Sequence, residues 1–259
     1  MSTSRRALLL WVAIALSALA VLLVLSRLPG RSLIQEGAEA WERGDLVEAR
    51  AAWEEAASSP FASGILLYDL GNVYYREGDL PRALACWRAA RGQRPRDPAL
   101  VHNIALARSH LEGVPEPVGV PVGWMALVTP GEVGLLATAL LIGFSVSARR
   151  WWHGRGQATP WLVLGTCGAL LGGAALHGGA QAHLHPVGVI VDGPAVARDA
   201  ATPEGRERFT LQPGAEVRVA RSLGAFVLVD TGDGRRGWVP APAVYTPGRE
   251  VFPPPGSTG

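Results

Sequence analysis

Three histidines stand near the end of an apolar stretch, and their side chains are of a type that binds metal ions. They are His177, His183 and His185, and neutral imidazole is a common metal ligand. No carboxylate or cysteine follows them before Asp192, and two helical residues two positions apart point in different directions. A structural zinc site is completed by four ligands. The pattern therefore favours polar residues at the end of an apolar segment over a metal site, and we predict no metal and no cofactor.

The remaining reactive side chains do not form a catalytic pattern. Glu132 is the one carboxylate in a long apolar stretch, and the letters TPGE from Thr129 to Glu132 predict a capping box at the start of a helix. An intramembrane functional carboxylate is the alternative. Cys167 lies within a long apolar stretch and Cys86 does not, and the two cysteines form no CxxC motif. The sequence has no nucleophile paired with a base, no phosphate-binding loop and no pair of carboxylates in a predicted cleft, so we predict that it is not an enzyme.

Three apolar stretches are long enough to cross a bilayer, which takes about 20 residues in a helix. They cover residues 7–26, 130–148 and 160–182, in a chain of 259 residues that is 48% hydrophobic. The first stretch could instead be a signal peptide cleaved near Ala18-Leu19-Ala20. The apolar run continues past that point, beyond the usual length of a signal peptide's apolar region, and this favours an uncleaved anchor.

Arginines near these stretches predict the orientation of the chain. Arg5 and Arg6 precede the first stretch, and Arg149, Arg150 and Arg155 lie between the second and the third, without an acidic residue beside them. The positive-inside rule places both segments in the cytoplasm. We therefore expect a multi-pass protein of the bacterial inner (cytoplasmic) membrane. Its N-terminus would be cytoplasmic, and residues 31–116 and the segment after 185 would lie on the periplasmic side.

The segment between the first two apolar stretches repeats itself every 34 residues. GDLVEARAAW begins at Gly44 and GDLPRALACW begins at Gly78. A fixed period of this length indicates stacked structural repeats, each too small to bury its own apolar face. Glycine at these two positions predicts that a helix ends there and that a second helix follows. Asp97 and Pro98 predict the start of a closing helix.

Beyond residue 187 the pattern changes from helical to strand-like. Apolar residues alternate with polar ones, and Val217, Val219, Val227 and Val229 fall on the predicted core side. A glycine-rich turn then separates two predicted strands. Short strands joined by turns indicate a small all-β barrel of about 60 residues. Residues 248–259 are too rich in proline and glycine to predict an ordered structure.

The second helical repeat resembles the tetratricopeptide (TPR) family, whose signature positions hold Leu67, Leu70, Gly71, Tyr74, Gly78, Ala83, Trp87, Ala90 and Pro95. The resemblance implies a concave groove that binds peptides, in which Asn72 and Asn103 would hold a partner's backbone. Further residues would line this peptide-binding groove: Trp41, Tyr68, Tyr75, Arg76, His102 and His110. Tyr68 stands where family members that bind a C-terminal carboxylate carry a basic residue, so the resemblance does not imply that mode of binding.

The letters GAFVLVDTGDGRRGWVP resemble the last two strands of the bacterial SH3-like (SH3b) family, and the resemblance covers residues 187–245. Phe226 stands where tryptophan is usual in that family. The resemblance implies a cell-wall-binding or protein-binding module whose surface would include Phe226 and Trp238. A single tryptophan in a small barrel is more often part of the core, and we expect that of Trp238.

The expected fold class is therefore a multidomain membrane protein with an all-α TPR array, three transmembrane helices and a small all-β SH3-like barrel. The expected domains are an anchor or signal (1–30), the TPR array (31–113, with repeats 30–63 and 64–97 and a capping helix 97–113), a linker (114–129), a two-helix transmembrane hairpin (130–182), the SH3-like barrel (187–247) and a disordered tail (248–259).

This order of parts resembles the TPR proteins of bacterial aerotolerance operons, of the BatE type. The resemblance implies a membrane complex with Bat-type proteins that carry von Willebrand A domains and, indirectly, with a MoxR-type ATPase. The formal charge of +2 gives no indication of nucleic-acid binding. Two functions remain open. One is a scaffold that holds partner proteins in the periplasm, and the other is a protein that binds or senses cell-wall peptidoglycan through the SH3-like domain.

Overall fold

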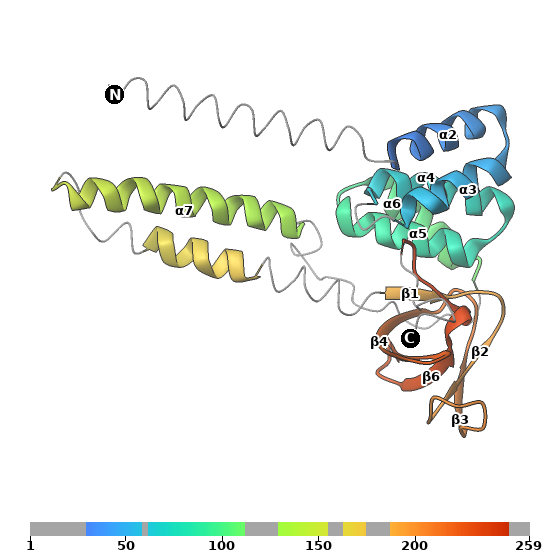
Figure 1. Cartoon of the computed structure of the whole chain (residues 1–259). Coiled ribbons are helices and arrows are strands. Elements are labelled where there is room, and N and C mark those ends of the chain that lie inside the picture. Colours follow the sequence, from blue (N-terminus) through green and yellow to red (C-terminus); the bar gives the residue numbers. More distant parts are fainter. Residues whose placement is uncertain (1–29, 59–61, 112–128, 155–162, 175–186, 249–259) are drawn as a thin grey trace, which may run out of the picture. The chain divides into compact units, whose positions relative to one another are not determined.

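The computed structural model describes residues 30–58, 62–111, 129–154, 163–174 and 187–248 (Figure 1). The first apolar stretch, the three histidines at 177, 183 and 185 and the predicted disordered tail after residue 248 lie outside these residues. The chain divides into two compact units, residues 1–62 and residues 63–259.

The described part of the first unit is a helical hairpin of α2 (Gly30–Arg43) and α3 (Leu46–Ala57). Gly44 has a φ of +80°, which lets the chain turn tightly between the helices. The carboxylate of Asp45 accepts a hydrogen bond from the backbone N–H of Glu48 and caps α3. The helices approach closely at Gly37, where an added methyl group would lie 2.3 Å from Trp53 Nε1.

The second unit begins with a hairpin that repeats this construction. It consists of α4 (Gly64–Glu77) and α5 (Leu80–Gln93). Gly78 has a φ of +85°, and the Asp79 carboxylate caps α5 through the N–H of Arg82. A methyl group at Gly71 would lie 2.5 Å from Trp87 Nε1. The 34-residue period of the sequence therefore corresponds to one helix–helix contact made twice, with a glycine on one helix and a tryptophan on the other.

A third helix and a sheet complete the second unit. Helix α6 (Pro98–Ser109) begins with Asp97 as its N-cap, as predicted. The sheet has the order β3-β2-β6-β5-β4-β1-β7 among the described residues, and every pairing is antiparallel. Its strands are β1 (Val187–Ile190), β2 (Ala195–Arg198), β3 (Glu207–Leu211), β4 (Glu216–Leu223), β5 (Phe226–Thr231), β6 (Arg236–Pro240) and β7 (Val244–Tyr245).

The core of the sheet is made mainly of valine. Val217, Val219, Val227 and Val229 are buried in one cluster, which confirms the core side predicted from their alternation. Trp238 does not belong to this cluster. It is half-buried on the opposite side of β6, between the buried Gly237 and Val239, so the expectation that it is a core residue was wrong.

One helix of the described residues is long and apolar enough to cross a membrane. It is α7 (Pro130–Trp152), whose spanning part is Gly131–Trp152. The predicted capping box at its start is confirmed, with Thr129 and Glu132 bonded to each other's backbone. A shorter apolar helix, Val163–Ala174, lies in the third apolar stretch.

The predicted fold class was wrong in two respects. The described residues hold one candidate membrane helix, where the sequence led us to expect three. The chain is also of mixed class, because α5 packs against β1 and the helices share one compact unit with the seven-stranded antiparallel sheet. The sequence patterns indicated the helical or strand periodicity of each segment taken alone. They contained no information on contacts between distant segments.

Candidate functional site

The predicted groove residues of α4 share one open face of that helix. Tyr68, Asn72, Tyr75 and Arg76 are three or four residues apart, and such residues lie side by side on a helix. Ile65 continues this face toward the start of α4. Ile65 is 62% exposed and Tyr75 is 42% exposed, although both are large apolar side chains. We call these five residues the α4 face.

Part of the α4 face also supports the helix–helix contact beneath it. The amide oxygen of Asn72 accepts a hydrogen bond of 3.3 Å from Trp87 Nε1. The ring centroids of Tyr75 and Trp87 are 5.7 Å apart. Asn72 therefore holds the buried indole in place, while its amide nitrogen donates to no described residue. The side chain can serve packing and binding together.

Charged side chains lie at one end of the α4 face. The guanidinium of Arg94 lies 5.7 Å from the ring centroid of Tyr68 and forms an ion pair of 2.6 Å with Asp97. Burial raises the pKa of Asp69, although the charge of Arg94 acts in the opposite direction. Arg94 thus links α4 to the start of α6, and the sequence patterns gave no indication of this.

The other predicted groove residues are not gathered onto the α4 face. His102 is exposed and Asn103 is half-buried on α6. His110 ends that helix, with its Nδ1 atom 2.9 Å from the carbonyl oxygen of Leu106. Trp41 belongs to the first unit, where its ring packs against Trp53 at a centroid distance of 6.1 Å.

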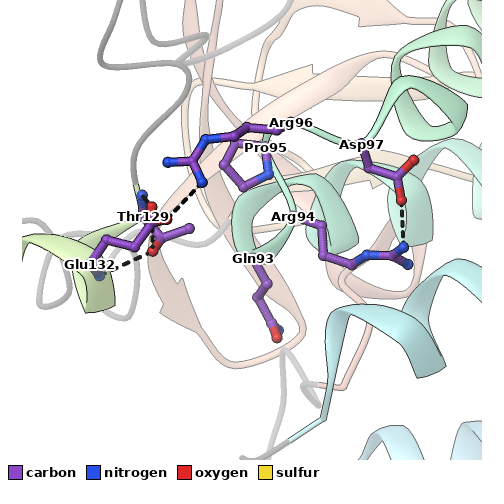
Figure 2. A pocket seen from close by; sticks show the side chains of 7 residues that line it. All are labelled: Gln93, Arg94, Pro95, Arg96, Asp97, Thr129 and Glu132. Carbon is purple, nitrogen blue, oxygen red and sulfur yellow. Dashed lines mark hydrogen bonds and ion pairs between the residues drawn. The ribbon is translucent and has the colours of Figure 1, made fainter. Parts of the chain in front are cut away.

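A cavity of about 490 Å³ lies between the α5–α6 turn and the start of α7 (Figure 2). Its lining is polar: Gln93, Arg94, Pro95, Arg96, Asp97, Thr129 and Glu132. Arg96 pairs with Glu132 at 2.7 Å, and Arg94 pairs with Asp97. The charged groups therefore neutralise one another, and Glu132 is also occupied as a helix cap. This arrangement fits a structural link better than a reaction centre.

A buried ion pair joins the helices to the sheet. Glu216, the first residue of β4, is completely buried. Its Oε2 atom lies 2.8 Å from Nε of Arg88 on α5, and its Oε1 atom lies 3.9 Å from a guanidinium nitrogen of Arg108 on α6. Just before β4, the side chain of Leu111 contacts the backbone at Gly214 so closely that a methyl group there would lie 2.6 Å from it.

A second set of contacts also joins helices α4 and α5 to the β-strand region. Arg82 donates two hydrogen bonds to Asp192, of 3.0 and 2.6 Å. The hydroxyl oxygens of Tyr74 and Tyr245 are 3.2 Å apart, and Arg82 also lies over the Tyr245 ring. Burial, together with the nearby Cys86 and Tyr74, raises the pKa of Tyr245 far above its usual range. We call the contacts of Glu216, Asp192 and Tyr245 with α4, α5 and α6 the helix–sheet junction.

The two residues predicted for the surface of the sheet lie on its side opposite the valine core. Phe226 and Trp238 are both half-buried, and each alternates along its strand with fully buried residues. Leu228 stands directly opposite Trp238 on the neighbouring strand. The family resemblance indicated the two aromatic residues but not the leucine, although the alternation of AFVLVD places Leu228 on the same side as Phe226.

Among the described residues, no three histidine, cysteine, aspartate or glutamate side chains lie close enough together to hold a metal ion. The site therefore consists of exposed apolar and amide side chains, with ion pairs that hold the elements together. Comparison with models of known protein families finds no match for this chain, and comparison with curated proteins finds none either.

Proposed function

We propose that this chain is a non-enzymatic scaffold, anchored in a membrane, that holds partner proteins through the α4 face. The observation that carries the proposal is the exposure of Ile65 and Tyr75 on a helix whose other side is fully packed. Exposed large apolar and aromatic side chains beside polar ones are typical of protein-binding surfaces.

The chemistry of the α4 face suits an extended peptide. Tyr75 and Ile65 offer apolar contact area, and the free amide nitrogen of Asn72 can donate to a backbone carbonyl of the partner. The unpaired peptide groups of an extended segment need such partners when they are desolvated. The resemblance to BatE-type proteins suggests the class of partner, namely membrane proteins with von Willebrand A domains.

The orientation in the membrane is part of the same proposal. Helix α7 supplies a candidate anchor, and its last turn carries Arg149 and Arg150 followed by the exposed Trp151 and Trp152. Tryptophan is enriched at membrane interfaces, and arginine is enriched on the cytoplasmic side. These features support a bacterial inner-membrane protein whose helices α2–α6 and sheet lie on the periplasmic side.

Changing the α4 face should remove partner binding without unfolding the protein. In full-length protein, Ile65→Asp combined with Tyr75→Ala removes exposed apolar area, and truncating a central interface residue of this kind commonly lowers affinity about tenfold or more. The measurement is co-purification with von Willebrand A-domain membrane proteins from native membranes, beside a thermal melt. Val47→Asp, at a 66%-exposed apolar position of α3, is the matched control. Equal recovery of these partners by the variant and the control would contradict the proposal.

A second candidate function rests on the sheet. Phe226 and Trp238 stand half-exposed on the side opposite the core, where aromatic rings can stack on sugar rings. This favours binding or sensing of cell-wall peptidoglycan. The full-length protein would then sediment with purified murein sacculi, and Trp238→Ala would reduce the bound fraction several-fold while Trp152→Ala would not. If the protein stays in the supernatant, cell-wall binding is excluded under those conditions.

A further inference from the structure

The sheet has an open surface that neither the helices nor the core uses. On the side opposite the valine core, one row of cross-strand neighbours crosses four strands: Arg221 on β4, Leu228 on β5, Trp238 on β6 and Arg198 on β2. Directly opposite residues of paired strands point to the same side. Leu223, which is 53% exposed, stands opposite Phe226 in the next row. We call this surface the outer sheet face.

Positive charge borders the apolar residues of the outer sheet face. The side chains of Arg218 and Arg221 form no hydrogen bond or ion pair with any residue that the structure describes. Arg198 is held by the carbonyl of Gly205 and by an ion pair of 3.4 Å with Glu207. Tryptophan and arginine are the residue types most enriched at the energetic centres of protein interfaces. The surface is therefore suited to an apolar and acidic partner.

The same chain carries a surface with this complementary character. Helix α2 has Glu36, Glu39 and Glu42 at three-residue intervals, and all three are exposed. Ile34, which is 40% exposed, and the exposed Ala38 precede Glu42 at intervals of four residues, so these two apolar side chains lie beside Glu42 and away from Glu36. Within the described residues, Glu36 and Glu42 have no hydrogen-bond or ion-pair partner, and Glu39 accepts one hydrogen bond from Gln35. We call this surface the acidic face of α2.

We propose that the outer sheet face of one copy binds the acidic face of α2 of a second copy. The charges are complementary, because the outer sheet face carries Arg218 and Arg221 without a described partner, and α2 carries exposed carboxylates without one. Ile34 and Ala38 would cover Leu228 and Trp238, while the glutamates would meet the unpaired arginines. The proposal goes beyond the scaffold function and does not depend on partner binding at α4.

The test is self-association of the full-length protein in detergent, measured by sedimentation velocity over a range of protein concentrations. We expect reversible association that weakens as salt is raised, since exposed charges are screened. Arg218→Glu with Arg221→Glu should weaken association about tenfold or more, and Glu39→Arg with Glu42→Arg should do the same. Mixing the two charge-reversed proteins should restore association, because each then offers the face that the other needs.

The control is Arg206→Glu, at an exposed arginine that lies outside the outer sheet face. Thermal melts of all variants check that each is folded. A protein that stays monomeric at every concentration would overturn the proposal, and so would charge reversals whose mixture fails to associate. Binding to anionic vesicles or to murein sacculi that is lost with Arg218→Glu and Arg221→Glu but kept with Glu39→Arg and Glu42→Arg, without self-association, would assign the face to lipid or cell wall instead and would likewise overturn it.

Discussion

Replacing Arg88 by methionine is expected to destabilise the helix–sheet junction by about 3–5 kcal/mol, because it leaves the carboxylate of Glu216 buried without its closest counter-charge. Glu216 is completely buried, and Arg88 lies 2.8 Å from it. Arg108 is too distant, at 3.9 Å, to replace the lost partner fully. The measurement is thermal melting and limited proteolysis of the full-length protein in detergent. We expect an earlier transition and new cleavage between the helices and β4.

A double variant distinguishes the effect of leaving one buried charge unpaired from the effect of lost packing at the junction. Arg88→Met together with Glu216→Leu removes both charges and keeps apolar volume, and such replacements of buried ion pairs are often neutral or stabilising. We therefore expect the double variant to melt closer to the unaltered protein than the Arg88→Met variant does. If Arg88→Met alone melts like the unaltered protein, the ion pair does not stabilise the junction.

Replacing Gly71 by alanine is expected to have the next largest effect, a loss of about 1–3 kcal/mol from overpacking. The new methyl group would lie 2.5 Å from Nε1 of Trp87, which is almost fully buried and has no space to retreat. Moving the indole would also break its hydrogen bond to Asn72. A thermal melt that follows tryptophan fluorescence should show the loss.

Gly92→Ala is the matched control for this substitution. Gly92 lies in the last turn of α5, and an added methyl group there would meet nothing within 4 Å. Since alanine is a better helix former than glycine, this variant should be unchanged or more stable by up to about 1 kcal/mol. Equal melting of the two variants would mean that Gly71 is not at the helix contact.

Features encoded by neighbouring residues could be predicted from the sequence. Asp97 caps a helix because its carboxylate needs only the N–H groups of the next residues, and the same is true of Thr129 and Glu132. The alternation of Val227 and Val229 identified the core side because a strand's side chains alternate by geometry. Gly78 likewise predicted a turn, because glycine readily adopts the positive φ at which a helix ends.

Features that depend on distant segments could not be predicted in this way. In the letters AEVRVA, Glu216 occupies a position that alternation assigns to solvent, yet α5 and α6 cover it completely. Arg82 and Asp192 are 110 residues apart, and no periodic pattern links them. Trp238 was assigned to the core because of its size, whereas its register opposite Leu228 places it on the outer sheet face. Four of the five residues of the α4 face were predicted from the sequence, and Ile65 was not.

The helix–sheet junction also constrains how the chain can be threaded through a bilayer. Helices α4–α6 precede α7 in the chain and the sheet follows it, yet Glu216 and Arg88 bring the two into direct contact. Two segments that touch must be in the same compartment, so the chain between Leu111 and Val187 must cross the membrane an even number of times. If α7 crosses, the chain must cross back before β1. This parity requirement does not depend on the distribution of arginines, and it means that, if α7 crosses a membrane, helices α4–α6 and the sheet lie on the same side of it.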